Sequence, residues 1–102
     1  HASVDERMLG AGLQAIIGVS LRPSARRESI VEFADRVRAL PQVIQVFFLG
    51  GDDDFLLHIA VADSSEMREF VLEHLSAQSS VASTRTSIVF DYHRNSVAAS
   101  FR

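Results

Sequence analysis

The chain has 102 residues, which suits one compact domain, and its hydrophobic content of 47% is too high for a disordered chain. Its formal net charge of -3 argues against a nucleic-acid-binding domain, because such domains are normally basic. The absence of cysteine excludes disulfides, cysteine nucleophiles and thiolate zinc sites, and it fits the reducing cytoplasm, where we expect the protein. We expect no membrane segment, because no apolar run approaches the roughly 18 residues that span a bilayer.

The first predicted element is a strand that follows a short lead-in. Residues 1–12 form the lead-in, and the domain itself is expected over 13–102. The chain begins with His1 rather than Met, which we interpret as the remnant of a tag or the cut end of a longer protein. From the start of the domain, apolar side chains alternate until Pro23, a period typical of a strand. Ser24 is then the predicted N-cap of a helix.

A helix and a second strand come next. Apolar side chains fall at helical spacing over residues 25–40, and Pro41 ends the helix. This stripe consists of Ile30, Phe33, Ala34, Val37 and Leu40. Residues 43–49 are almost continuously apolar, which predicts a buried strand. Strict alternation groups its apolar residues into two faces, Val43, Phe47 and Leu49 on one and Ile44, Val46 and Phe48 on the other.

A third strand, a second helix and a fourth strand complete the chain. Glycines and aspartates over 50–53 predict a tight turn into a strand over 54–61, and so an antiparallel hairpin. Asp63 and Glu66 have the spacing of a capping box at a helix N-terminus. The apolar stripe of this helix is Met67, Phe70, Val71 and Leu75. The fourth strand is expected from Val81 to about Tyr92.

This β-α-β-β-α-β order predicts an α+β, ferredoxin-like fold, an antiparallel four-stranded sheet with both helices on one face. The other face would expose the apolar second strand, so something must cover it. We expect a homodimer that pairs these open faces, with either Phe48 or Phe47 at the interface. The alternative cover is the tail, residues 93–102, which is short and polar.

The predicted turn carries the most suggestive chemistry. Its adjacent carboxylates, Asp52, Asp53 and Asp54, could bind a hard cation, but the calcium-loop spacing is absent and a solvated turn is the simpler interpretation. A third interpretation is that glycine N–H groups and a carboxylate bind the two charges of an amino acid. The acids that lead the third strand argue against RNA. The four histidines lack metal-site spacing, and no nucleophile elbow, phosphate loop or dinucleotide motif is present, so we expect no catalytic residue, metal or cofactor.

Three segments in order resemble the Lrp/AsnC family of bacterial transcription regulators. Residues 51–57 are similar to its effector-domain signature, residues 80–89 to its last strand, and residues 4–10 to the lead-in after its DNA-binding part. The resemblance implies the C-terminal effector-binding (RAM) domain, which pairs in the manner of dimeric α/β barrels and assembles into octamers or similar rings. It also implies an effector, often an amino acid, and DNA contact only through an N-terminal helix-turn-helix domain that this chain lacks.

The resemblance places the effector site at the hairpin loop, between dimers. We expect its residues to be Gly51, Asp52, Asp53, Asp54, Thr84 and Thr86. Loop N–H groups suit an effector carboxylate, and Asp54 suits an α-ammonium group. Gly50 and Asp53 depart from the threonine and tyrosine of many members, which favours a cationic effector or abolishes binding. The alternatives to a regulator are a dimeric α/β-barrel enzyme and an ACT-type amino-acid-binding domain.

Overall fold

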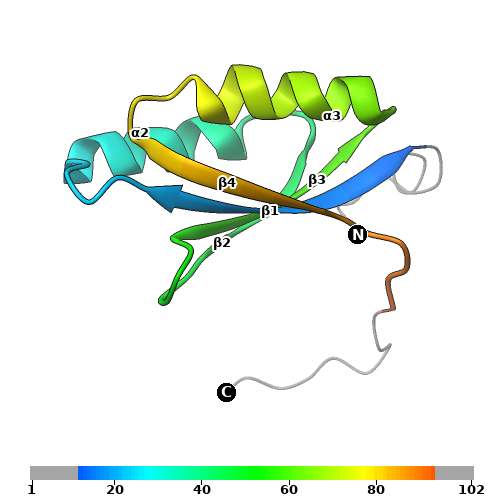
Figure 1. The fold of residues 1–102 in the computed structure, drawn as a ribbon, viewed down its shortest axis with the longest axis horizontal. Helices are drawn as coiled ribbons and strands as arrows, with labels where there is room; N and C mark the ends of the chain where they lie inside the picture. Colours follow the sequence, from blue (N-terminus) through cyan, green and yellow to red (C-terminus); the bar gives the residue numbers. More distant parts are fainter. Residues whose placement is uncertain (1–11, 94–102) are drawn as a thin grey trace.

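The computed structural model describes residues 12–93, which form one four-stranded sheet and two helices (Figure 1). In chain order the elements are β1 (Leu13–Leu21), α2 (Arg27–Arg38), β2 (Val43–Phe48), β3 (Phe55–Val61), α3 (Ser64–Phe70), its π-helical continuation η1 (Val71–Ser76) and β4 (Val81–Ile88). The strands are arranged β2-β3-β1-β4, and every neighbouring pair is antiparallel. The predicted ferredoxin-like fold is confirmed, whereas the lead-in falls almost wholly outside the described residues.

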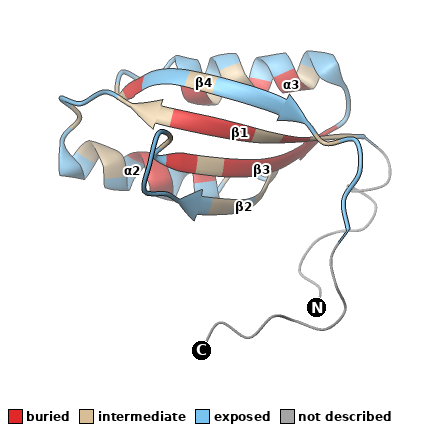
Figure 2. Cartoon of the chain, turned by 60° about the horizontal axis from the view of Figure 1, so that its bottom comes forward, coloured by how far each residue is buried: buried red, intermediate tan, exposed pale blue. Residues whose placement is uncertain are grey.

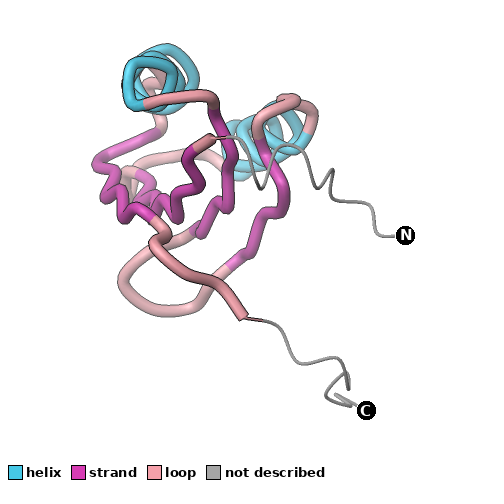
Figure 3. The backbone as a smooth tube through the Cα atoms, turned by 90° about the vertical axis from the view of Figure 1, so that its right-hand side faces the viewer, coloured by secondary structure: helices cyan, strands magenta, loops and turns pink. Residues whose placement is uncertain are grey.

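Both helices cover the same face of the sheet, and the core lies between them (Figures 1 and 3). The two central strands supply most of it, and Figure 2 shows them buried between more exposed edge strands. The predicted alternation holds in β1, where Ala15, Ile17 and Val19 are fully buried. The fully buried residues opposite them on β3 and the helices are Phe33, Val37, Leu57, Ile59 and Leu75.

The two helices begin differently. Ser24 is not the N-cap of α2, because the chain first makes a turn in which Ala25 N–H donates to the Arg22 carbonyl over 2.9 Å. The helix then starts at Arg27, with no side-chain cap. At α3 the predicted capping pair forms, since the Asp63 carboxylate accepts from Glu66 N–H over 2.9 Å.

The edge strand β2 contains an irregularity that alternation does not predict. Val43 pairs with Ile59, but the next paired residue is Gln45, opposite His58, so Ile44 is an extra residue. Val43 therefore lies on the helix-covered face, and its predicted grouping with Phe47 is wrong.

The end of β2 settles which phenylalanine faces the open side. Phe48 pairs with Phe55 on the helix-covered face, where their ring centroids are 4.8 Å apart. Phe47 pairs with Leu56 and points to the face that the helices leave open. Phe47, not Phe48, is thus the aromatic residue of the open face.

The fourth strand is shorter than the prediction of a strand to about Tyr92. β4 ends at Ile88, and one further bond joins Val89 N–H to the Gln14 carbonyl over 2.9 Å. The proposed cover by the tail falls, except for its first residue, outside the described residues. None of the helices within residues 12–93 has the length and apolar character to span a bilayer.

Candidate functional site

The loop between β2 and β3 curls away from the helices and over the open face of the sheet (Figures 1 and 3). It closes where Leu49 N–H donates to the Asp54 carbonyl over 3.0 Å. Gly51 has a φ of 129°, a region that side chains other than glycine rarely adopt. A second bond, from Asp54 N–H to the Val19 carbonyl over 2.9 Å, ties the end of the loop to β1. The sequence therefore builds a fixed loop rather than a loose turn.

Asp53 turns its carboxylate back onto the sheet. Its Oδ1 accepts from the Ser20 hydroxyl over 3.1 Å, and its Oδ2 accepts from Arg85 Nη2 over 2.7 Å. A Cβ placed on Gly18 would lie only 2.6 Å from Oδ2, so the carboxylate occupies space that the glycine leaves empty. The side chain of Asp53 is consequently only 18% exposed, although it belongs to a surface loop.

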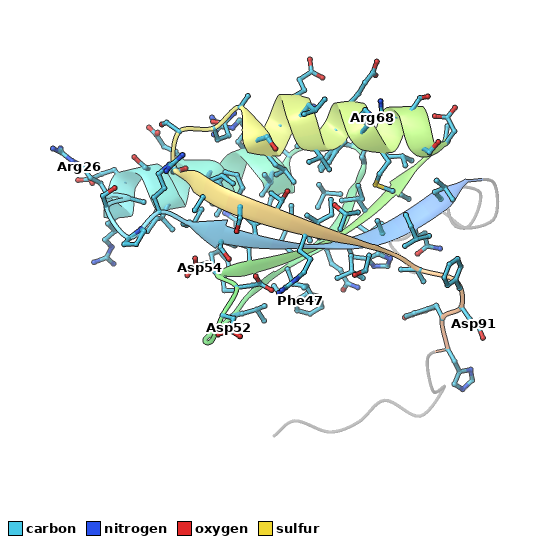
Figure 4. The ribbon with its side chains drawn as sticks, in the orientation of Figure 1. Arg26, Phe47, Asp52, Asp54, Arg68 and Asp91 are labelled. Carbon is cyan, nitrogen blue, oxygen red and sulfur yellow. The ribbon has the colours of Figure 1, made fainter. Side chains whose placement is uncertain are left out.

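The neighbouring aspartates are placed differently, at the same end of the sheet (Figure 4). Asp54 Oδ2 accepts from Leu21 N–H over 2.7 Å, while within residues 12–93 its other oxygen has no hydrogen-bond partner. Asp52 is exposed, and its carbonyl accepts a long bond of 3.3 Å from the Ser20 hydroxyl. Asp54 can therefore still accept a hydrogen bond from a ligand, and Asp52 is exposed to solvent.

These contacts do not favour the hard-cation interpretation. Asp53 is paired with an arginine and Asp54 with a backbone N–H, so the adjacent carboxylates do not converge on one point. In the described part of the chain, no group of three or more histidine, aspartate or glutamate side chains is placed to hold a metal ion.

Thr84 and Thr86 share one face of β4, as their spacing predicts. Thr84 pairs with Val19 and Thr86 with Ile17, both core residues, so the threonines lie on the helix-covered side of this edge strand. The intervening Arg85 lies on the open face. Within a single chain, the threonines and the loop carboxylates are thus on opposite faces of the sheet.

The sequence interpretation missed Arg85 and Ser20. Both alternate with residues of the opposite face, and only the direction of the loop shows that they meet Asp53. The pairing with Arg85 also weakens the expectation that Asp53 attracts a cationic effector, because its charge is already balanced.

His58 is the one buried polar or charged side chain among the described residues, and it lies centrally on the open face. Its Nε2 is 2.7 Å from Gln14 Oε1, and its Nδ1 is 3.1 Å from Gln45 Nε2. A neutral ring satisfies both contacts, with Nε2–H donating and Nδ1 accepting. Burial lowers the pKa of His58 below its ordinary value, because the charged form loses hydration. Both nitrogens are engaged, so the ring is poorly placed for acid–base catalysis.

Comparison with known proteins gives one family and a consistent set of relatives. A family model described as the Lrp/AsnC ligand binding domain matches residues 14–98. The HTH-type transcriptional regulator AldR of Mycolicibacterium smegmatis is 46% identical over 94 residues, which are 92% of this chain and 54% of that protein. AldR of Mycobacterium tuberculosis is 43% identical over 92% of this chain and 52% of its own length. The chain thus spans about half the length of these curated relatives.

Solved structures agree with this comparison. A crystal structure of the M. tuberculosis AldR superposes with a TM-score of 0.84 at 35% identity, covering 97% of this chain and 65% of that one. A transcriptional regulator of Neisseria meningitidis, solved as a complex with L-Met, gives a TM-score of 0.80 at 31% identity and covers 96% of this chain and 64% of that one.

Proposed function

This chain belongs to the Lrp/AsnC ligand-binding domain family, and on that premise we propose that it senses an amino acid for a transcriptional regulator. The observation that carries the proposal is the similar regulator that was solved with L-Met. The curated relatives of this chain are transcriptional regulators, which favours a regulatory role over catalysis or an ACT-type role. Contact with DNA would be made by a separate helix-turn-helix domain.

The proposed effector site is the hairpin loop, Gly51 to Asp54, together with Thr84 and Thr86. The free oxygen of Asp54 would accept a hydrogen bond from the α-ammonium group, since its other oxygen already accepts one from Leu21 N–H. Charge-assisted bonds of this kind contribute about 1.5–3 kcal/mol each. Because the threonines and loop lie on opposite faces of one sheet, a site that uses both needs a second chain.

The proposed assembly begins with a homodimer through the open faces. Phe47 is exposed there, and its neighbour Leu56 and, on the same face of β1, Ile16 are only half-buried in the single chain. Pairing two copies would cover these side chains and leave no exposed apolar sheet. Such dimers would then associate into an octamer or similar ring, which brings the loop of one dimer toward the threonines of another.

Calorimetry across the twenty amino acids tests the function. We expect saturable binding of at least one of them by the parent, and binding about ten-fold weaker or more by Asp54→Ala, because one charge-assisted bond is lost. Asp91→Ala is a matched control, since Asp91 is also exposed and also accepts one backbone N–H, from Tyr92, over 2.8 Å.

Each failure has its own meaning. No binding of any amino acid by the parent would refute amino-acid sensing. Equal affinity in the parent and Asp54→Ala would refute the assignment of the site to Asp54 while leaving the sensing function in place.

A further inference from the structure

The surroundings of Asp53 have the composition of a site for a carboxylate. A guanidinium, a hydroxyl donor and a glycine without a side chain converge on it from β4 and β1. We infer that Arg85, Ser20 and Gly18 form a carboxylate-binding subsite on the open face, and that Asp53 fills it as an internal ligand. An external carboxylate would bind by replacing Asp53.

The sheet holds this subsite together independently of the loop. Gly18 and Arg85 are direct partners in the β1–β4 ladder, and Ser20 follows two residues later on the same face. Arg85 and Ser20 therefore keep their spacing when Asp53 leaves. Any other residue at position 18 would place a Cβ 2.6 Å from Asp53 Oδ2, so close approach of a carboxylate needs glycine there.

An incoming carboxylate can reach Arg85 before Asp53 departs. The arginine side chain is 72% exposed, and within residues 12–93 it makes one hydrogen bond, to Asp53. A guanidinium has five N–H donors, so most of them remain available from the solvent side. Exchange can thus begin on the exposed side of Arg85 and finish with Asp53 in water.

The exchange would release only part of the loop. Asp54 stays tied to β1 through Val19 and Leu21, so the third strand keeps its pairing. The remaining contact of the loop tip with the sheet is the long Ser20–Asp52 bond of 3.3 Å. The Ser20 hydroxyl has one proton, and it would donate this proton to the incoming carboxylate instead, so the bond to Asp52 would be lost as well. Displacing Asp53 therefore frees residues 50–53 from the open face. If the proposed function holds, the natural ligand is the α-carboxylate of the effector, and binding is coupled to the surface on which copies would pair.

Acetate is a probe that tests the subsite without any effector. We would follow the backbone amide NMR signals of Gly18 and Ser20, which every variant retains, during acetate titration at constant ionic strength, in the parent, Asp53→Asn and Asp91→Asn. Asn keeps the size of the side chain and removes the charge. Asp91 is exposed, accepts a hydrogen bond from Tyr92 N–H and lies at the other end of the sheet (Figure 4), so its variant is the matched control.

We expect Asp53→Asn to bind acetate about five-fold more tightly than the parent. The ion pair between Asp53 and Arg85 that acetate must displace contributes about 1 kcal/mol. A ten-fold change in affinity corresponds to about 1.4 kcal/mol, so removing this competition should raise the affinity about five-fold. Asp91→Asn should match the parent, and in a further variant, Asp53→Asn with Arg85→Gln, the gain should disappear. Equal acetate affinity in the parent and Asp53→Asn, or an equal gain in Asp91→Asn, would overturn the inference.

Gly18→Ala provides a second test that leaves both charges in place. The added methyl group should expel Asp53 and speed amide hydrogen exchange at residues 50–53, while exchange in β3 stays slow. Unchanged exchange in the loop would also overturn the inference. The acetate and amino-acid titrations distinguish the two proposals. If acetate displaces Asp53 but no amino acid binds, the proposed function is refuted and the subsite stands. If an amino acid binds but acetate does not displace Asp53, the subsite alone is refuted.

Discussion

Replacing Phe47 by aspartate should dissociate the proposed dimer without unfolding the chain. Phe47 projects from an edge strand onto the open face and is 43% exposed, so a charge there remains in water when the chain is alone. In a dimer paired through that face, the same carboxylate would be buried opposite apolar side chains, which carries a large desolvation cost.

The lost contact area sets a lower limit on the effect. A phenylalanine offers about 200 Å² for burial. The 43% still exposed is therefore about 90 Å², which contributes about 2 kcal/mol at about 25 cal/mol per Å². A two-fold interface contains the substitution twice, so the loss is about 4 kcal/mol, or about a thousand-fold in the dimer dissociation constant. Desolvation of the two carboxylates adds to this loss.

Sedimentation equilibrium over a range of concentrations measures that constant. Val31→Asp is the matched control, because Val31 is equally apolar and 51% exposed but lies on α2, away from the open face. A Phe47→Asp variant that stays dimeric like the parent, with a native circular dichroism spectrum, would refute pairing through the open face. Loss of the dimer in both variants would also count against this interface.

Two further predictions concern stability. Burial lowers the pKa of His58 in the folded chain below the ordinary histidine pKa of 6.5. Below pH 6.5 the unfolded chain therefore binds more protons than the folded chain, so the free energy of unfolding should fall as the pH drops through and below 6.5. Urea unfolding from pH 7.5 to 5 should show a smaller decrease for His58→Gln, and an identical pH dependence would contradict this account. Asp63→Ala removes the side-chain cap of α3 and should lower the free energy of unfolding by about 1 kcal/mol, while Ser24→Ala, at a position that caps nothing, should change it little.

Much of the fold could be predicted because its strands and helices carry clear periods. The alternation in β1 and the helical stripe of Phe33, Ala34 and Val37 both follow from one buried face per element. The start of α2 could not be predicted in this way, because a turn at Ser24 competes with the helix and local residue type does not decide between them. The face of Val43 was missed for a similar reason, since one extra residue in β2 leaves no mark in an apolar run.

Only those residues of the candidate site that are contiguous in the sequence could be predicted. The loop and its aspartates stand together in the sequence, so their proximity needed no structure. The partners of Asp53 lie more than thirty residues away, on two other strands, and alternation hides Arg85 between Thr84 and Thr86. These residues converge because the loop folds over the open face, and contacts between side chains that are distant in the sequence determine that direction.

The extra residue in β2 bears on how this domain tolerates changes in length. Removing one residue from a strand normally reverses every side chain on one side of the deletion. Here Val43 and Gln45 already pair with the consecutive residues Ile59 and His58, so loss of Ile44 would leave a regular ladder with both faces intact. Deletion of one residue should therefore be accepted at this point of β2 and rejected along the rest of the strand.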